Sequence, residues 1–444
     1  MAKTIVALST PPGIGGIAVI RLSGDKAFEI VDCIFHGKTK ISDSQRHTIH
    51  YGKVMRNGEI VDTVTVSVFR NPHSYTGEDV AEINCHGGMI VASEIIELCV
   101  EQGAELAKPG EFTRRAFING KLDLSQVEAV ADIIHSTTKL ASQTAARQLI
   151  GNFRKRLDEI TINLMSIASL LELELDFADE DIELVEKQQI AEKLKQVIEY
   201  CEDLSRSHKS AEILRNGFYV GIAGFPNSGK STLFNTLLQK HRAIVSPQPG
   251  TTRDYIEESL YINDMHIRLV DTAGIRKSDD MIEVEGVRLV DQVLQQADLI
   301  LIINDATKGL DHSDELSRGI KEKHKDKEII IVQNKIDLLD EKNVQGISAK
   351  HNQGIEKLKE MIYEKAKVSF SKDMDVLVNQ RQAILLKQAA EILKNALYSF
   401  EHNLDNTVIS IDIREAAEKL GEITGKKWSE DVLNNIFSRF CIGK

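Results

Sequence analysis

One stretch, FYVGIAGFPNSGKS at residues 218–231, decides the fold expected for the middle of this 444-residue chain. An apolar strand pattern leads into Gly-x-x-x-x-Gly-Lys-Ser, and a helical pattern follows from Thr232 to Gln239. In this order of strand, loop and helix, backbone N–H groups cradle phosphates. The loop residues predicted to hold a nucleotide are Asn227, Ser228, Gly229, Lys230, Ser231 and Thr232, with Lys230 neutralising phosphate oxygens and Ser231 binding Mg²⁺.

Around this loop, residues 217–368 alternate short β-branched runs with helical stretches, which predicts a parallel sheet flanked by helices. Strands are expected over 258–262 and 266–270, joined by a turn at Asn263-Asp264. Asp271 closes the second strand and is predicted to hold Mg²⁺ through water. Thr272, Ala273 and Gly274 follow it, and the Gly274 N–H is expected to meet the γ-phosphate.

Base recognition is predicted at Asn334, Lys335 and Asp337, which follow an apolar strand at 329–332. The Asp337 carboxylate can accept hydrogen bonds from N1–H and the exocyclic amine of guanine, and adenine would leave a buried carboxylate unpaired. Ser348, Ala349 and Lys350 come next, where a GTPase backbone amide meets guanine O6. These residues predict GTP rather than ATP.

The Pro/Gly-rich segment at 246–254 suits a switch that closes on the γ-phosphate. Thr252 is its predicted Mg²⁺ ligand, and Ser246 and Thr251 are expected to contact the nucleotide. Ile275 stands where Ras-like enzymes keep the glutamine that orients the attacking water. Another residue must therefore position water, or hydrolysis is poor.

The flanks predict two further domains. Residues 1–118 read as an α+β domain with strands at 17–22 and 61–69, the second following a turn at Arg56-Asn57-Gly58-Glu59. Residues 122–216 contain almost no glycine or proline and repeat apolar residues at helical spacing. The helical pattern returns at 383–400 and from Arg414 to the end. We therefore expect a helical domain made of 119–216 plus 369–444, interrupted by an inserted Ras-like P-loop G domain at 217–368; a separate C-terminal helical domain is the alternative.

Composition narrows the class of protein. The formal net charge of −12 argues against a protein that coats nucleic acid over its whole surface, although a local basic patch remains open. Five scattered cysteines indicate reduced thiols and no zinc site. No apolar run reaches the roughly 18 residues of a membrane span, so a soluble, cytoplasmic protein is expected.

These motifs, together with PGEFTRRAF at 109–117, NGKLDL at 119–124 and CIGK at 441–444, resemble the MnmE (TrmE) family of tRNA-modifying GTPases over essentially the whole chain. The resemblance implies a folate-binding-like N-terminal domain and a GTPase cycle that drives addition of a carboxymethylaminomethyl group to C5 of the wobble uridine of certain tRNAs. It also implies a homodimer, held by the N-terminal domains, and a flavin-dependent MnmG (GidA) partner.

The resemblance assigns further residues. It implies a K⁺ ion bound by Asn227, Ser246, Gln248 and Thr251, and water orientation by Glu283, with Glu285 the nearest competitor. It places a tetrahydrofolate derivative (5-formyl- or 5,10-methylene-tetrahydrofolate) at Arg21, Glu82, Lys121 and Lys444, and Cys441 near the modification chemistry with its role open. Pro247 and Pro249 depart from many relatives and affect the expected strength of K⁺ dependence.

Four alternatives stay open at this stage. An RNA-binding ribosome-assembly GTPase would carry the same nucleotide motifs, and a nucleotide-gated scaffold would bind GTP without turnover. Cys441 is also compatible with a buried structural thiol. The basic run at 154–156 is compatible with a contact to tRNA phosphate or with a solvated helix face.

Overall fold

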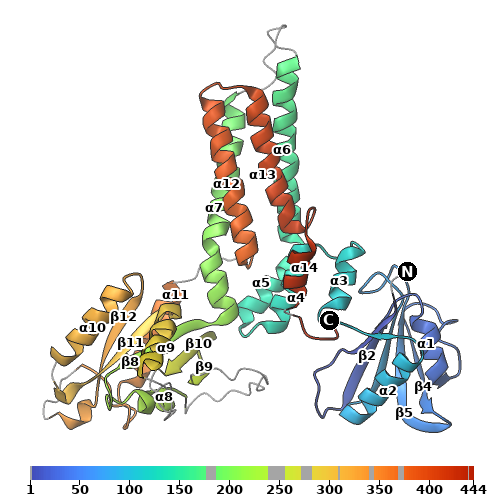
Figure 1. Cartoon of the computed structure of the whole chain (residues 1–444), viewed down its shortest axis with the longest axis horizontal. Helices are drawn as coiled ribbons and strands as arrows, with labels where there is room; N and C mark the ends of the chain where they lie inside the picture. The colour runs from blue at the N-terminus through green and yellow to red at the C-terminus, as the bar shows by residue number, and fades with distance from the viewer. Residues whose placement is uncertain are drawn as a thin grey trace. The chain divides into compact units, whose positions relative to one another are not determined.

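The computed structural model describes residues 3–176, 187–238, 256–271, 283–308, 311–339, 345–368, 375–438 and 440–444. Internal contacts divide the chain into two compact units. The first comprises Met1–Ile134, Ala146–Glu202 and Ile384–Lys444, and the second comprises His135–Ala145 and Asp203–Ala383. Each unit contains both sheet and helix, which confirms the mixed α/β and α+β class (Figure 1). The three-domain boundaries stay a prediction.

The second unit contains a five-stranded sheet with strand order β12-β11-β8-β10-β9. The strands are β8 (Phe218–Gly224), β9 (Ile256–Ile262), β10 (Met265–Asp271), β11 (Leu299–Asp305) and β12 (Glu328–Asn334). All neighbours are parallel except β9 and β10, which form an antiparallel hairpin. Its turn residues Asn263 and Asp264 have φ of 48° and 65°, as the sequence predicted for this position.

Helices cover both faces of this sheet. The helices are α8 (Lys230–Leu238), α9 (Glu283–Gln296), α10 (Asp311–Lys323) and α11 (Ile355–Val368). Alternate residues of β8 face opposite sides: Val220 packs in a core with α8 and α11, and Tyr219 packs in a core with α9 and α10. Because helices bury both faces of the sheet, we expect a ligand to bind at the loops that follow the carboxyl ends of the parallel strands.

The first unit contains a seven-stranded sheet with strand order β3-β4-β5-β6-β2-β1-β7. The strands are β1 (Ile5–Leu8), β2 (Ile17–Ser23), β3 (Phe35–Gly37), β4 (Thr48–Arg56), β5 (Glu59–Phe69), β6 (Val80–His86) and β7 (Glu105–Leu106). Helices α1 (Ala27–Ile34) and α2 (Met89–Glu101) share one hydrophobic core with the sheet. Asn57 and Gly58, both at positive φ, turn the β4–β5 hairpin at the predicted place.

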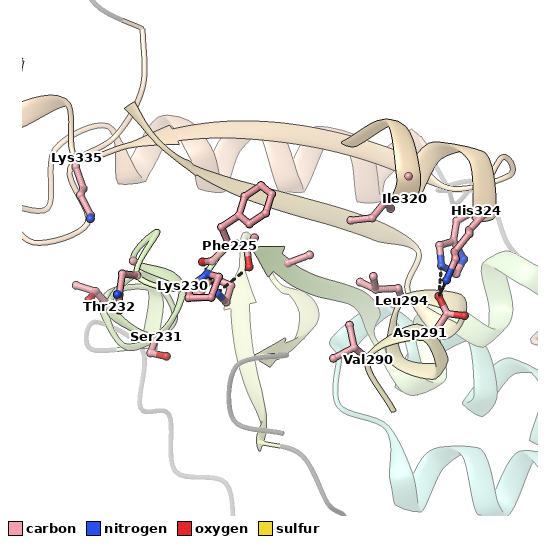
Figure 2. Close-up of a pocket in the computed structure, with 17 residues that line it drawn as sticks. Phe225, Lys230, Ser231, Thr232, Val290, Asp291, Leu294, Ile320, His324 and Lys335 are labelled. Atoms are coloured by element: carbon pink, nitrogen blue, oxygen red, sulfur yellow. Dashed lines mark hydrogen bonds and ion pairs between the residues drawn. The ribbon is translucent and has the colours of Figure 1, made fainter. Parts of the chain in front are cut away.

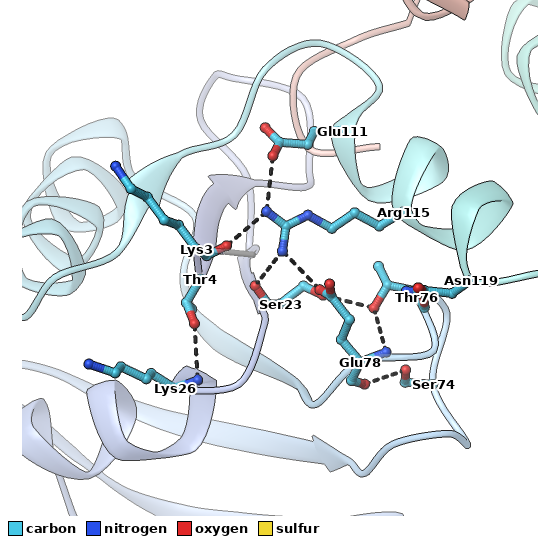
Figure 3. A network of polar contacts seen from close by, with 10 residues as sticks. All are labelled: Lys3, Thr4, Ser23, Lys26, Ser74, Thr76, Glu78, Glu111, Arg115 and Asn119. Atoms are coloured by element: carbon cyan, nitrogen blue, oxygen red, sulfur yellow. Dashed lines mark hydrogen bonds and ion pairs between the residues drawn. The ribbon is translucent and has the colours of Figure 1, made fainter. Parts of the chain in front are cut away.

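Helix α3 (Glu111–Ile118) packs against β1, where Phe112 is fully buried beside Ile5 and Ala7. Its Arg115 ties the helix to the sheet through a polar network (Figure 3). The guanidinium donates to Glu78 at 2.9 Å, to the Lys3 carbonyl at 2.8 Å and to Glu111 at 3.0 Å. Because the side chains of Arg115, Glu78 and Glu111 are largely shielded from water, the network fixes α3 in place.

Long helices follow, as the glycine-poor sequence predicted. They are α4 (Leu124–His135), α5 (Lys139–Leu149), α6 (Asn152–Asp176), α7 (Lys187–Asn216), α12 (Gln380–Glu401), α13 (Asn406–Thr424) and α14 (Glu430–Phe437). Helices α6 and α13 pack along each other, and ion pairs Lys195–Glu401 at 2.8 Å and Lys394–Glu202 at 2.5 Å join α7 to α12 (Figure 1). Within the described ranges, none of the helices combines the length and apolarity that a membrane span requires.

The helical pattern expected from Arg414 to the end is present only in part, because it is interrupted once and stops before the last residues. Helix α13 ends at Gly425, whose φ of 83° is left-handed, and α14 begins only after Ser429, whose hydroxyl caps it. Glycine adopts this conformation without the steric cost that other residues incur, which terminates the helix. The break creates a turn at 425–429, and Gly425, Lys426 and Trp428 of this turn line a pocket.

His266 on β10 anchors the 135–145 segment to the five-stranded sheet. Its Nδ1 lies 3.1 Å from the Thr137 hydroxyl and its Nε2 lies 2.9 Å from the Ser259 hydroxyl, while the ring stacks on Tyr261. Burial, helped by nearby Arg268, lowers the pKa of His266 to about 4. The folded state therefore favours the neutral imidazole.

We predict that the β9–β10 hairpin loses stability between pH 6.5 and pH 4. An unfolded histidine titrates near pH 6.5, so the unfolded state binds the extra proton in this window, costing roughly 1.4 kcal/mol per pH unit. Amide hydrogen exchange of β9 and β10, corrected for intrinsic rates, should show about 2 kcal/mol less protection at pH 5 than at pH 7. In His266→Gln this difference should largely disappear; an unchanged difference would rule out His266 as its source.

Candidate functional site

The phosphate-loop sequence folds into a tight turn between β8 and α8. Asn227 and Gly229 have φ of 63° and 94°. A Cβ atom at Gly229 would overlap the Asn334 side-chain amide, so glycine is required there both by the backbone conformation and by the space. The loop therefore brings its backbone close to β12 and leads directly into the N-terminus of α8.

Lys230 lies at that N-terminus and is buried. Its ammonium donates to the carbonyls of Gly224 and Phe225, both at 2.9 Å, so its charge is held over the loop itself. A positive charge and the first backbone N–H groups of a helix converge at this point. Both features favour an anion such as a phosphate.

Ser231 and Asp271 meet across the loop, as predicted. The Ser231 hydroxyl donates to Oδ2 of Asp271 at 2.9 Å, and Asp271, the last residue of β10, is buried. A hydroxyl and a carboxylate are the hard oxygen ligands that Mg²⁺ prefers. The pair fits a Mg²⁺ site in which one ligand binds directly and the other through water.

Asn334, the last residue of β12, connects two loops. It is only 2% exposed, its amide nitrogen donates to the Ser228 carbonyl at 2.9 Å, and its amide oxygen accepts from the Ala349 N–H at 3.0 Å. The carbonyl of Ala349 in turn accepts from the Thr236 hydroxyl of α8 at 2.9 Å. The predicted base-recognition residues are therefore fixed to the phosphate loop by buried hydrogen bonds.

Asp337 lies in a short 3₁₀ turn (Ile336–Leu338) beside this junction. The Ser348 hydroxyl holds the pKa of Asp337 below its usual value, with weaker help from His351 and Lys350. The carboxylate is therefore ionised at neutral pH and can accept hydrogen bonds from a base. Asp337, Ser348, Ala349 and Lys350 are brought together as the sequence predicted.

Lys335 precedes this turn at a φ of 66° and extends along the pocket. Its ammonium pairs with Asp305 Oδ2 at 2.6 Å. Burial works to raise the pKa of Asp305, but Lys335 and Thr307 outweigh it and hold the pKa below its ordinary value. The ion pair fixes the Lys335 stem, whose apolar length can cover one face of a bound base.

A pocket of about 850 Å³ opens beside these residues. Figure 2 shows Lys230, Ser231 and Thr232 gathered at the start of α8, with Val290, Leu294 and Ile320 on the other side of Phe225. On that side, Nε2 of His324, the residue after α10, lies 3.2 Å from Oδ1 of Asp291 on α9. The volume suits a nucleotide-sized ligand.

Two contributors were missed by the sequence reasoning. Asp305 ends β11 next to the strand that carries Asn334, and Thr236 lies on the second turn of α8. The position of Asp305 at the carboxyl end of a buried strand was an available signal. Thr236 gave none, because a threonine at that helical position is ordinarily a surface residue.

Several predicted residues lie outside the described part of the chain. They are Ser246, Gln248, Thr251, Thr252, Thr272, Ala273, Gly274 and Ile275. Glu283 is the first residue of α9, but the side chains of Glu283 and Glu285 also lie outside the description. Their assigned roles stay predictions. In the described ranges, no group of three or more His, Cys, Asp or Glu side chains is arranged to hold a metal ion.

A second cluster forms on the seven-stranded sheet. Arg21 and Glu82 are directly opposite on β2 and β6, and their side chains pair at 2.8 Å. The Arg21 guanidinium lies 5.5 Å from the ring centroids of both Phe112 and Tyr75. Burial, and then repulsion by Arg21, lower the pKa of Lys444, against the opposing effect of Glu82. Three of the four predicted folate residues are thus neighbours.

Lys121, the fourth, donates to the Pro72 carbonyl at 2.9 Å and makes none of these contacts. Gly443 holds the chain end, because its carbonyl accepts a hydrogen bond from the Ser9 hydroxyl at 3.1 Å. Its φ is 96°, and a Cβ atom at this position would overlap the Leu8 carbonyl. Cys441, two residues earlier, is exposed. The alternative of a buried structural thiol is therefore wrong, because the tight docking of the last two residues leaves Cys441 at the surface.

Known proteins resemble this chain over its whole length. The sequence profile for the MnmE helical domain matches residues 124–441, and that for the GTP-binding protein TrmE N-terminus matches residues 4–121. The tRNA modification GTPase MnmE of Acetivibrio thermocellus is 42% identical, over 99% of each chain. That of Aquifex aeolicus is 40% identical over 100% of each chain, and that of Thermoanaerobacter pseudethanolicus is 41% identical over 99% of each.

Among solved structures, the G domain of the T. maritima FeoB iron transporter is 28% identical and covers 34% of this chain and 99% of that chain, with a TM-score of 0.26. At that score the sequence relatives, rather than the structural neighbour, carry the assignment. Their similarity spans both the nucleotide loops and the Arg21 cluster. The chain belongs to the MnmE family of tRNA modification GTPases.

Proposed function

We propose that the pocket at the carboxyl edge of the five-stranded sheet binds GTP in preference to ATP and is the site of hydrolysis. The observation that carries this proposal is the Asn334 bridge, which fixes the phosphate loop and the Ser348–Lys350 loop to one another. With these loops held, Lys230 and the α8 N-terminus face the phosphates and Asp337 faces the base. Asn227, Ser228, Gly229, Ser231 and Thr232 line or support the phosphate end.

Two ions complete the proposed site. Ser231 and Asp271 supply the described oxygen ligands for Mg²⁺, and Thr252 supplies another. For K⁺ the proposed ligands are Asn227, a residue that lines the pocket, and Ser246, Gln248 and Thr251, which lie outside the described residues. A bound K⁺ supplies positive charge to the phosphates, as an arginine finger does in other GTPases. Glu283 orients the attacking water, since Ile275 has no polar group with which to do so.

The cycle of hydrolysis drives modification at C5 of the wobble uridine in certain tRNAs, in concert with a flavin-dependent partner. A reduced folate is the one-carbon donor in this proposal. The Arg21 cluster fits such a ligand, because Glu82 can accept from pterin N–H groups, Lys444 can pair with a glutamate tail and two aromatic rings lie alongside. Lys121 would have to leave the Pro72 carbonyl to join it.

The proposal includes a homodimer, a cytoplasmic location and the three-domain division at residues 118, 216 and 368. Cys441 is exposed and lies two residues before Gly443, whose carbonyl accepts a hydrogen bond from Arg21. This position suits a role in the modification chemistry. A ribosome-assembly GTPase is less well supported, because full-length similarity to tRNA modification GTPases extends through the N-terminal unit.

Replacement of Asp337 should change the base preference. In Asp337→Asn we expect GTP binding to weaken roughly 10- to 100-fold, the loss typical of hydrogen bonds to a charged acceptor. Xanthosine triphosphate, which presents an oxygen where guanine presents its amine, should gain affinity because the new amide can donate to it. Competition binding with GTP, XTP and ATP measures both effects. Equal losses for all three nucleotides would mean that Asp337 does not read the base.

Turnover should depend on the monovalent cation and on Glu283. At matched ionic strength, we expect GTP hydrolysis in potassium chloride to exceed that in sodium chloride by at least about tenfold, since the ion substitutes for an arginine finger. Glu283→Ala should abolish the potassium-stimulated rate while nucleotide binding persists, and Glu285→Ala is the matched control. Equal rates in both salts, or loss only in Glu285→Ala, would contradict these assignments.

A further inference from the structure

A second pocket of about 290 Å³ lies within the unit that holds the seven-stranded sheet. It is formed by the chain after α3, the first turn of α6 and the turn that ends α13. The lining residues that matter here are Phe117, Asp123, Arg154, Lys426 and Trp428. None of them belongs to the nucleotide site or to the Arg21 cluster.

Asp123 brings to this pocket a carboxylate oxygen that lacks a hydrogen bond. Its side chain is 5% exposed, and its Oδ1 accepts from the Ser125 hydroxyl at 2.6 Å and the Gln126 N–H at 3.0 Å, which caps α4. Among the described residues, its Oδ2 is buried without a hydrogen-bond partner. It forms an ion pair with the Arg154 guanidinium at 3.7 Å, a distance longer than a hydrogen bond. A buried acceptor without a hydrogen bond is costly, and an N–H donor that reaches Oδ2 from the pocket, which Asp123 lines, would satisfy it.

Trp428 gives the same pocket an aromatic surface. The residue is 46% exposed and is the only tryptophan of the chain. Its ring packs edge to face against Phe117, with centroids 5.9 Å apart and planes at 69°. An indole held by such a contact offers a preorganised surface on which a flat ring can stack, and such stacking tolerates any base.

Two cations stand at the rim of the pocket. Arg154 and Lys426 are about half exposed, and both pair with Asp158, at 3.5 Å and 2.8 Å. Exposed pairs of this kind are weak and exchange readily for other anions. A guest that is flat, donates an N–H group and carries negative charge outside the pocket therefore matches all three features.

We propose that this pocket binds the base of a nucleotide, which stacks on Trp428, donates an N–H to Oδ2 of Asp123 and directs its phosphate to Arg154 and Lys426. The base belongs to an unpaired nucleotide of tRNA or to a free nucleotide. With tRNA as its source, the inference rests on the proposed function, and it makes the pocket an RNA anchor separate from both the GTP site and the folate cluster.

Trp428 fluorescence reports occupation directly, because no other tryptophan contributes. The full chain is titrated with an unmodified tRNA transcript, and separately with AMP and CMP, which lack the guanine edge read by the GTP site. Binding of fluorescently labelled tRNA is followed in parallel by anisotropy. We expect saturable quenching by tRNA, and tRNA binding weakened roughly 5- to 100-fold in Trp428→Ala, the range for loss of one stacked base. Trp428→Phe should retain most of the affinity.

Asp123→Asn tests the acceptor while keeping a side chain that can cap α4. It should weaken tRNA binding about tenfold or more, because the polar atom at Oδ2 changes. Asp405→Asn, the same change at the exposed N-cap of α13, is the matched control and should bind tRNA normally.

The outcomes distinguish a failure of the base-binding pocket from a failure of the proposed tRNA-modifying function. Tight tRNA binding with no quenching, and no effect of Trp428→Ala or Asp123→Asn, would overturn the pocket inference while leaving tRNA as the substrate. Absence of tRNA binding by anisotropy would count against the proposed function, and the pocket is then judged by AMP and CMP. Quenching by these nucleotides alone assigns the pocket to a free nucleotide, and quenching by neither overturns it.

Discussion

The pair of hydrogen bonds made by the Asn334 side chain is the constraint on which the nucleotide site depends. One bond reaches the phosphate loop at Ser228 and the other reaches the base-recognition loop at Ala349. These loops are separated by more than a hundred residues, yet one buried amide fixes their spacing. If either partner were lost, a buried polar group would be left unsatisfied at a cost of roughly 1–3 kcal/mol.

The five-stranded sheet makes this bridge possible. Its β12 strand ends at Asn334 and its β8 strand ends at the phosphate loop, and parallel strands bring both ends to the same edge. Gly229 then allows the loop to approach Asn334 at a distance that any larger residue would prevent. The seven-stranded sheet works differently, because Arg21 and Glu82 meet on adjacent antiparallel strands and the chain end, held by Gly443, closes over them.

Local features were predictable from the sequence. The phosphate loop, the Asn263-Asp264 and Asn57-Gly58 turns and the long helices depend on neighbouring residues, and all lie where the patterns placed them. The bonds that assemble the sites join distant residues and gave no local signal, as with Thr236 to Ala349 or Arg21 to Gly443. The helix break at Gly425 was missed because its apolar pattern runs on, and glycine's left-handed conformation outweighs that pattern.

The most direct test of the central claim is the calorimetric affinity for GDP of the wild-type chain and of Asn334→Ala. Two buried hydrogen bonds are lost, so the account predicts binding at least about 30-fold weaker. Asn304→Ala, which removes a buried amide of β11 that bonds to Gln333, is the control and should bind GDP nearly as well as the wild type. Unchanged affinity in a folded Asn334→Ala chain would contradict the claim that this side chain assembles the site.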